Sequence, residues 1–300
     1  MQNTNWVTWA LLTYLIIFIF GVPALLVWRA KRRQERPPLE FKLLRGPGES
    51  LRRRVTTFEA WGLLKVTAAG LIPLGVAIVA LQILIWFAPK TPFQLGLGLS
   101  LAALATLVAI FFAGRWCYRL LNRYRNDALG YLGERVVGEA LDALNRQGFR
   151  VFHDVPAEAN GTKFNVDHVA IGENGLFAIE TKTRRKGRAR PGFEAHKVAY
   201  DGTQLIWPWS EDTHGLDNAR DRASWLGDWL HQRTGLKLNP QPVLALPGWY
   251  VVPQGNGAVL VLNHKQLAPT ILRTDAGRLT PAQVDLISRQ LDDLCRDVED

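Results

Sequence analysis

Two carboxylates and one ammonium group lie close together in the middle of the sequence, in Asp167, Glu180 and Lys182. They fall in two β-prone runs, 163–171 and 176–183, which flank the turn signal Gly-Glu-Asn-Gly. If these runs pair as a hairpin without a bulge, Asp167 stands directly opposite Glu180, and opposed side chains share one face. Lys182 stands two residues beyond Glu180, so it points to the same face. The hairpin therefore predicts a cluster of two acids and one base.

This cluster has the composition of a metal-dependent phosphodiesterase site. Two carboxylates this close repel each other unless a cation lies between them. Mg²⁺ prefers oxygen ligands and takes one or two carboxylates together with water and substrate phosphate. We therefore expect Asp167 and Glu180 to bind Mg²⁺ or Mn²⁺, which would activate a water molecule. We expect Lys182 to orient that water and to offset charge at phosphorus.

A third acid is predicted on a helix over residues 133–147. Val137, Leu141 and Leu144 form an apolar stripe on this helix. Glu134 lies at the edge of the stripe, whereas Glu139 lies on the opposite side. We therefore expect Glu134 to face the sheet and Glu139 to face solvent.

These segments together resemble a known family of nucleases. Gly133-Glu134 with the apolar stripe, Asn165-Val166-Asp167-His168 and Glu180-Thr181-Lys182 are similar to the motifs of the nuclease-related domain (NERD) family, which is grouped with the PD-(D/E)xK nucleases. The resemblance covers roughly residues 130–270. It implies that Asp167, Glu180 and Lys182 are catalytic, with Glu134 as the helix acid, and that the substrate is nucleic acid. The family often has a glutamine in the following helix, and Asn218 takes that place here, where we expect it to contact nucleic acid.

The segment after the hairpin is strongly basic. Its cations are Arg184, Arg185, Lys186, Arg188 and Arg190. Such a run is usually a solvated loop, but beside a phosphodiesterase site it would bind backbone phosphates, and we favour this second interpretation. His168 points away from the Asp167 face, so we expect it to be packed or hydrogen-bonded. We expect Trp207 and Trp209 to be core or loop anchors rather than base-stacking platforms.

The N-terminal part of the chain is predicted to cross a membrane. Residues 6–27, 63–87 and 95–113 are apolar and each is long enough to span the bilayer. Basic residues crowd the segments 29–62 and 115–125, whereas Lys90 alone lies between the second and third spans. The positive-inside rule places the N-terminus outside and the C-terminal domain in the cytoplasm, at a bacterial inner membrane.

The predicted fold class is α/β. Helical and β-rich segments alternate after residue 130, which favours a mixed central sheet flanked by helices. Among them we expect a strand pair within 198–207 and a last helix that is capped by Thr280, opens at Pro281 and runs to about Val298. The family resemblance implies a restriction-endonuclease-like domain. The predicted parts are a first transmembrane helix (1–28), a basic cytoplasmic loop (29–62), second and third transmembrane helices (63–114), a juxtamembrane linker (115–130) and the NERD-like domain (131–300).

Three functions remain open from the sequence. The first is a membrane-anchored, Mg²⁺-dependent endonuclease that acts on DNA in preference to RNA. The second is a non-catalytic nucleic-acid-binding or scaffolding module tethered to the bilayer. The third is a regulatory domain whose basic loops bind anionic lipid. The net charge of +9 fits all three, and the two cysteines, Cys117 and Cys295, suggest neither a disulfide framework nor a zinc cluster.

Overall fold

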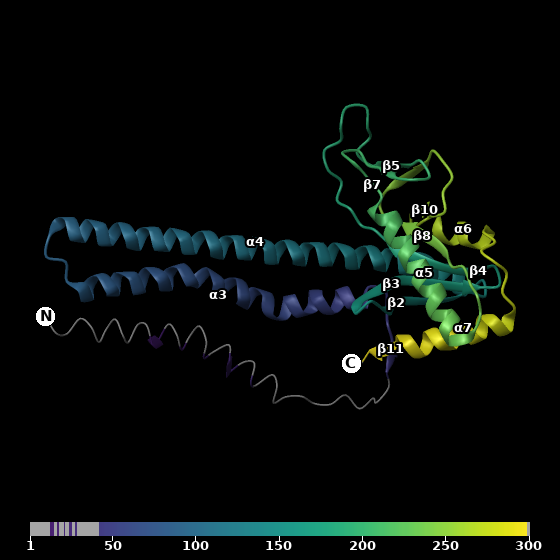
Figure 1. Ribbon diagram of the computed structural model, residues 1–300, viewed down its shortest axis with the longest axis horizontal. Coiled ribbons are helices and arrows are strands. Elements are labelled where there is room, and N and C mark those ends of the chain that lie inside the picture. Colours follow the sequence, from purple (N-terminus) through teal and green to yellow (C-terminus); the bar gives the residue numbers. More distant parts are fainter. Residues whose placement is uncertain are drawn as a thin grey trace. The chain divides into compact units, whose positions relative to one another are not determined.

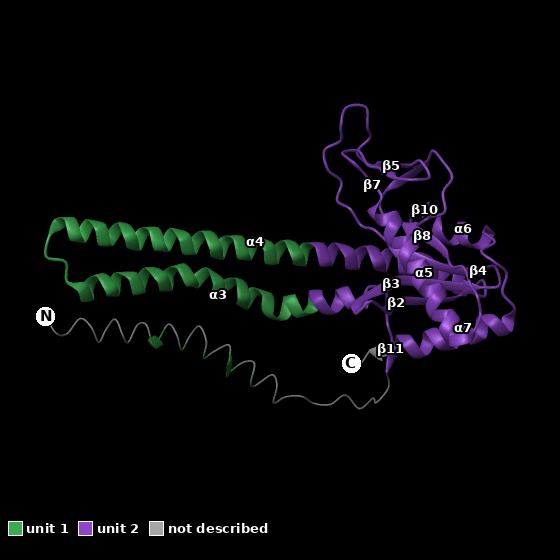
Figure 2. Cartoon of the chain, viewed as in Figure 1, with its two compact units in different colours: residues 1–40, 56–125 green, residues 41–55, 126–300 purple. Residues whose placement is uncertain are grey.

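The protein is described here from a computed structural model. The structure describes residues 42–298 and, before them, Thr13, Tyr14, Ile17, Gly21, Ala24, Leu25 and Trp28. The first predicted span, 6–27, therefore lies almost wholly outside the described residues. The chain divides into two compact units, Met1–Glu40 with Thr56–Arg125, and Phe41–Val55 with Asn126–Asp300 (Figure 2).

Two long helices account for the apolar sequence of the described residues. α3 (Glu49–Phe87) and α4 (Pro92–Asn145) are long and apolar enough to cross a membrane by length and composition. The predicted fold had three such helices, and the described part of the chain contains two.

Both helices are longer than the sequence patterns suggested. α3 begins at Glu49, so much of the predicted loop 29–62 is helical. α4 continues through 115–130, the predicted linker, and includes the helix predicted over 133–147. Residues 115–129 contain neither glycine nor proline, so nothing in the local sequence ends the helix.

The second unit is built on a mixed five-stranded sheet (Figure 1). Its strands are β2 (Arg150–Ala159), β3 (Thr162–Gly172), β4 (Gly175–Thr181), β8 (Gln241–Ala245) and β10 (Leu260–Leu262). They lie in the order β10-β8-β4-β3-β2. The first three pair antiparallel, whereas β4, β8 and β10 pair parallel.

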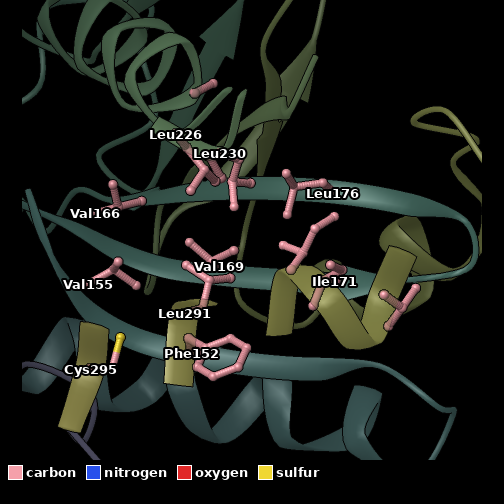
Figure 3. Close-up of a cluster of buried hydrophobic side chains, with 14 of the residues drawn as sticks. Phe152, Val155, Val166, Val169, Ile171, Leu176, Leu226, Leu230, Leu291 and Cys295 are labelled. Carbon is pink, nitrogen blue, oxygen red and sulfur yellow. The ribbon is translucent and has the colours of Figure 1, made fainter. Parts of the chain in front are cut away.

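Helices cover both faces of this sheet, which confirms the predicted α/β class. α5 (His214–Thr234) and α7 (Pro281–Cys295) bury an apolar cluster with one face, and Figure 3 shows Val155, Val169 and Leu291 meeting there. The C-terminal part of α4 and α6 (Leu267–Arg273) pack on the other face. α7 begins as predicted, because Thr280 caps it and Pro281 opens it.

A smaller four-stranded sheet adjoins the main one. It contains β5 (Lys197–Tyr200), β6 (Leu205–Ile206), β7 (Glu211–Asp212) and β9 (Tyr250–Pro253). β5 and β6 pair antiparallel, which confirms the strand pair predicted within 198–207. Their turn is closed by Asp201, whose Oδ1 accepts hydrogen bonds from the backbone N–H groups of Thr203 and Gln204, both at 2.8 Å.

The segment before the apolar helices belongs to the second unit, which the sequence did not indicate. β1 (Leu43–Leu44) pairs antiparallel with β11 (Arg296–Val298), where α7 was expected to continue. Pro47 packs against Gly138 of α4 so closely that a Cβ at residue 138 would lie 2.4 Å from its Cγ. Residues 41–55 are therefore part of the folded domain and not of a loop.

A buried ion pair holds this segment in place. Arg45 Nη1 lies 2.8 Å from Asp154 Oδ2, with side-chain exposures of 11% and 4%. Ser50 donates to the same oxygen from its Oγ at 2.6 Å and from its backbone N–H at 3.1 Å. Asn165 Nδ2 donates to Asp154 Oδ1 at 2.8 Å. Burial raises the pKa of Asp154, and its contacts with Ser50 and Arg45 oppose that rise.

We predict that Arg45→Ala lowers the free energy of unfolding by about 3 kcal/mol, because it leaves the buried Asp154 carboxylate without its cation. The measurement is denaturant unfolding of the full chain in detergent. The matched control is Arg150→Ala: Arg150 pairs with Asp285 at 2.6 Å, but both side chains are 52% exposed, so its loss should cost under ~1 kcal/mol. Equal losses in the two variants would contradict a structural role for Arg45.

Candidate active site

The hairpin of β3 and β4 has the predicted register. Ile171 pairs with Leu176, and His168 pairs with Ile179 at the end of the ladder. The turn is tighter than predicted, since Gly172 pairs with Gly175. Asp167 and Glu180 are the next residues on each strand, so both acids stand just beyond the last pair of the ladder.

Four acids line one cavity of about 350 Å³ in the second unit. They are Glu134 from α4, Asp154 from β2, Asp167 from β3 and Glu180 from β4. Ser50, Leu51 and Arg54 of α3 also line it, as does Arg222 of α5. The cavity therefore brings together three predicted site residues, Glu134, Asp167 and Glu180, with residues that the sequence analysis did not single out.

A break in the β2–β3 ladder shapes this cavity. His153 pairs with His168 and Val155 with Val166, but the step between them, at Asp154 and Asp167, is unpaired. Asp154 has φ of 49°, a left-handed conformation that is uncommon outside glycine. Phe152 and Val155 consequently lie in the same apolar cluster, although regular alternation would separate them. The break frees both carboxylates from the regular pleat.

Asp167 and Glu180 are each fixed by one hydrogen bond. Asp167 Oδ2 accepts from the backbone N–H of Thr181 at 2.7 Å. Glu180 Oε1 accepts from Asn218 Nδ2 at 3.2 Å. Asn218, expected to contact nucleic acid, thus contacts a catalytic candidate in this structure.

Glu134 is buried with one of its two carboxylate oxygens unpartnered in the described part of the chain. It is 8% exposed, and its Oε2 is buried without a hydrogen-bond partner among the described residues. Glu139, five residues later, is exposed and pairs with Arg135 at 3.1 Å. The prediction that Glu134 faces the domain and Glu139 faces solvent is confirmed.

Burial and mutual repulsion raise the pKa values of these acids. Burial raises the pKa of Glu134 to about 8, and the charges of Asp154 and Glu180 contribute to the rise. The pKa of Asp167 is raised well above its usual range by burial and then by Glu180 and Glu134. Burial also raises the pKa of Glu180, against the opposing effects of Asn218, Arg222 and Lys182.

These acids fit a divalent cation. A cation would remove the repulsion that raises their pKa values and would supply a partner for Glu134 Oε2. Among the described residues, no group of three or more His, Cys, Asp or Glu side chains is arranged so that it could hold a metal ion, so the protein would offer a cation two carboxylates at most. A site with two carboxylates and room for water and phosphate is the arrangement that Mg²⁺ prefers.

Two arginines supplement the predicted Lys182. Lys182 is partly buried and its backbone N–H donates to Ala245 O at 2.9 Å, but its side chain is not among those that line the cavity. Arg222 lines it, and Arg222 lowers the pKa of Glu180 more than Lys182 does. Arg222 stands four residues after Asn218, so helical spacing alone could have placed both on one face of α5. Arg54, by contrast, has no such signal.

The basic run lies mostly along the smaller sheet. Arg184 forms an ion pair with Asp212 and stacks on Trp207 at 4.6 Å. Lys186 lies 5.9 Å from the ring centre of Trp249, and Arg190 lies 3.6 Å from Glu211. Two other cations of the run have different surroundings: Arg185 donates to Asn126 Oδ1 at 2.8 Å, and Arg188 is exposed. None of these cations lines the carboxylate cavity, so phosphate binding by the run stays a prediction.

Two further predictions about single side chains are confirmed. His168 is fully buried, and its Nδ1 lies 2.8 Å from Nδ1 of His153, so it is packed and hydrogen-bonded. Trp207 is fully buried in the core that joins the smaller sheet to α5.

We predict that Glu134→Gln weakens the pH dependence of stability. Wild-type Glu134 keeps its proton in the folded state up to a pH of about 8, against 4.5 for the ordinary group. Between these values the folded state binds more protons, so the free energy of unfolding falls as pH rises, by at most about 1.4 kcal/mol per pH unit. The variant should lose this contribution. Unfolding midpoints of the full chain in detergent and EDTA, across that pH range, measure it.

Glu139→Gln is the control for this experiment, because Glu139 is exposed on the same helix. Its pH dependence should equal that of the wild type. An equally steep decline in Glu134→Gln and wild type would show that Glu134 does not hold a proton in the folded state.

Comparison with known proteins identifies the family that this part of the chain resembles. A search of curated proteins found no match, and a search of solved structures found none. One family model matches, the nuclease-related domain, over residues 129–247. The match begins within α4, includes all three predicted acids and ends just after β8. The resemblance is therefore confirmed: residues 129–247 of this chain match the NERD family, a nuclease-related domain.

Proposed function

We propose that the chain is a membrane-anchored, metal-dependent nuclease that hydrolyses phosphodiester bonds, with DNA favoured over RNA. The observation that carries the proposal is the convergence of Glu134, Asp167 and Glu180 in one cavity of the nuclease-related domain. Buried acids with raised pKa values are characteristic of catalytic sites, because burial and neighbouring like charges shift pKa values to what acid–base and metal chemistry needs.

The proposed chemistry divides between the acids and the cations of the site. Asp167 and Glu180, with Glu134 beside them, would hold Mg²⁺ or Mn²⁺, which supplies Lewis acidity and lowers the pKa of bound water. The water oxygen bonds to phosphorus while the bond to the leaving oxygen breaks. The water gives up one proton and the leaving oxygen takes one up, so the reaction needs no redox partner.

Lys182 and Arg222 have different proposed tasks. Arg222 lines the cavity and opposes the negative charge at Glu180. A guanidinium presents several donors in a plane, which suits the oxygens of a phosphate. Lys182 acts from the end of β4, where it would orient the attacking water. Asn218 positions Glu180 through its hydrogen bond.

The wider architecture is proposed on the same basis. A helix, the β2-β3-β4 meander, the crossover helix α5 and the parallel strand β8 would form a restriction-endonuclease-like core. The apolar segments of α3 and α4 would anchor the chain in a bacterial inner membrane. The basic residues that flank these segments support a cytoplasmic position for the nuclease-related domain, with the N-terminus outside.

One observation favours a second candidate function. Lys182 does not line the cavity that holds the acids. If its side chain takes no part in the reaction, the same face would bind nucleic acid without cleaving it, as a membrane-tethered binding or scaffolding module.

We predict that the full chain in detergent nicks or linearises plasmid DNA with Mg²⁺ and not with EDTA. Asp167→Asn and Glu180→Gln should each reduce the rate at least ~100-fold. Each removes a carboxylate that would hold the metal, and a bound metal stabilises the charged transition state by several kcal/mol. The full chain is required because Ser50 and Arg54 line the cavity from outside the matched residues 129–247.

Glu139→Gln is the matched control and should cleave like the wild type. Salt-sensitive DNA binding without cleavage in any divalent cation would favour the binding module over the nuclease. Cleavage that survives both Asp167→Asn and Glu180→Gln would contradict the proposed site.

A further inference from the structure

A strip of three aromatic side chains lies beside the carboxylate cavity. It consists of Phe164 from β3 and of Trp225 and Trp229 from α5. The ring centres of Phe164 and Trp225 are 5.6 Å apart, with planes at 75°. Those of Trp225 and Trp229 are 6.0 Å apart, with planes at 21°. The two tryptophans stand one helical turn apart, so α5 presents them side by side.

This aromatic strip lines a second cavity of about 480 Å³, which adjoins the first. Lys163, Phe164 and Asn165 line both cavities. All three rings are partly buried, since Trp225 and Trp229 pack against the main apolar cluster while also lining the cavity. The aromatic strip is therefore continuous with the candidate active site and open to a ligand.

Cations stand at both ends of the aromatic strip. The guanidinium of Arg222 lies 4.0 Å from the ring centre of Phe164, on the side of the carboxylate cavity. That of Arg233 lies 5.7 Å from the ring centre of Trp229, at the far end. Lys163 is exposed between the two cavities, and Glu158 is the one acid that lines the second. Nε of Arg222 is buried without a hydrogen-bond partner among the described residues.

Alternating aromatic faces and cations suit a single nucleic-acid strand. Unpaired bases stack on aromatic side chains, and arginine and lysine bind the phosphates between them. A duplex cannot use such a strip, because its bases are already stacked on one another. A core function alone explains the buried sides of the tryptophans, but it does not explain cations at both ends or the shared wall with the acids.

We propose that the aromatic strip of Phe164, Trp225 and Trp229 binds unpaired bases of a strand whose backbone enters the carboxylate cavity. This rests on the proposed nuclease function and adds a preference for single-stranded regions, such as free strands, flaps or gaps, over intact duplex. Phosphate contacts by Arg222 would link the two cavities, since it lies between the first ring and Glu180.

The test is fluorescence anisotropy with the full chain in detergent and EDTA, so that binding is measured apart from cleavage. The probes are labelled oligothymidylate, labelled oligouridylate and a blunt DNA duplex of equal length. The wild type should bind the single strand more tightly. Trp225→Leu and Trp229→Leu should each weaken that binding about 5- to 100-fold, the effect of losing one stacked base.

Two controls separate binding from folding. Trp225→Phe keeps an aromatic face and should bind nearly as the wild type does. Tyr250→Leu removes an exposed aromatic ring that also has a cation above it, Lys197 at 5.8 Å, but on the smaller sheet, and should leave binding unchanged. Equal affinity for duplex and single strand, or unchanged affinity in both tryptophan-to-leucine variants, overturns the proposal.

The outcomes also distinguish this proposal from the nuclease function. Plasmid cleavage with normal binding by both leucine variants refutes the aromatic strip and leaves the nuclease. Loss of binding in these variants, in a protein that cleaves nothing, refutes the nuclease and leaves the strip. Oligouridylate bound in place of oligothymidylate would support the strip and assign it to RNA.

Discussion

Carboxylates buried side by side repel each other, and the second unit holds Glu134, Asp167 and Glu180 in this condition. An apolar core of the same volume would be more stable, because buried charges lose hydration that their neighbours only partly replace. A helix and two strands nevertheless position these acids, and the β2–β3 ladder is interrupted beside them. A local loss of stability of this kind is characteristic of a functional site.

Local periodicity was sufficient to predict the acids themselves. The register of β3 and β4 follows from a tight turn and a two-residue alternation, so the sequence alone placed Asp167 and Glu180 at the same end of the hairpin. Helical spacing likewise separated Glu134 from Glu139. Each of these inferences uses residues within one helix or one hairpin, where geometry is set by neighbours along the chain.

Local periodicity could not predict which other residues surround these acids. Arg45 and Asp154 are 109 positions apart, and no period connects them. The break in the β2–β3 ladder depends on the left-handed backbone conformation of Asp154, which is not a glycine, and sequence patterns do not indicate such a position. The segment 41–55 is basic and short, so it was interpreted as a loop, although it pairs with β11 and lines the cavity. Sites assembled from distant segments are visible only in the fold.

The charge of the cavity also constrains how it would use a substrate. A phosphodiester adds negative charge to a cavity in which acids already have raised pKa values, and Arg222 and the largely exposed Arg54 are its arginines. On the proposed function, cation and nucleic acid must therefore each strengthen the binding of the other, because each relieves a repulsion that the other meets. Linkage makes this effect reciprocal and equal in free energy. The aromatic strip would contribute to the binding free energy independently of this repulsion, since base stacking does not depend on the charge of the acids. Base stacking would hold a strand beside the cavity before a cation binds there. Once the cation offsets the charge of the acids, a phosphate of that strand could bind in the cavity.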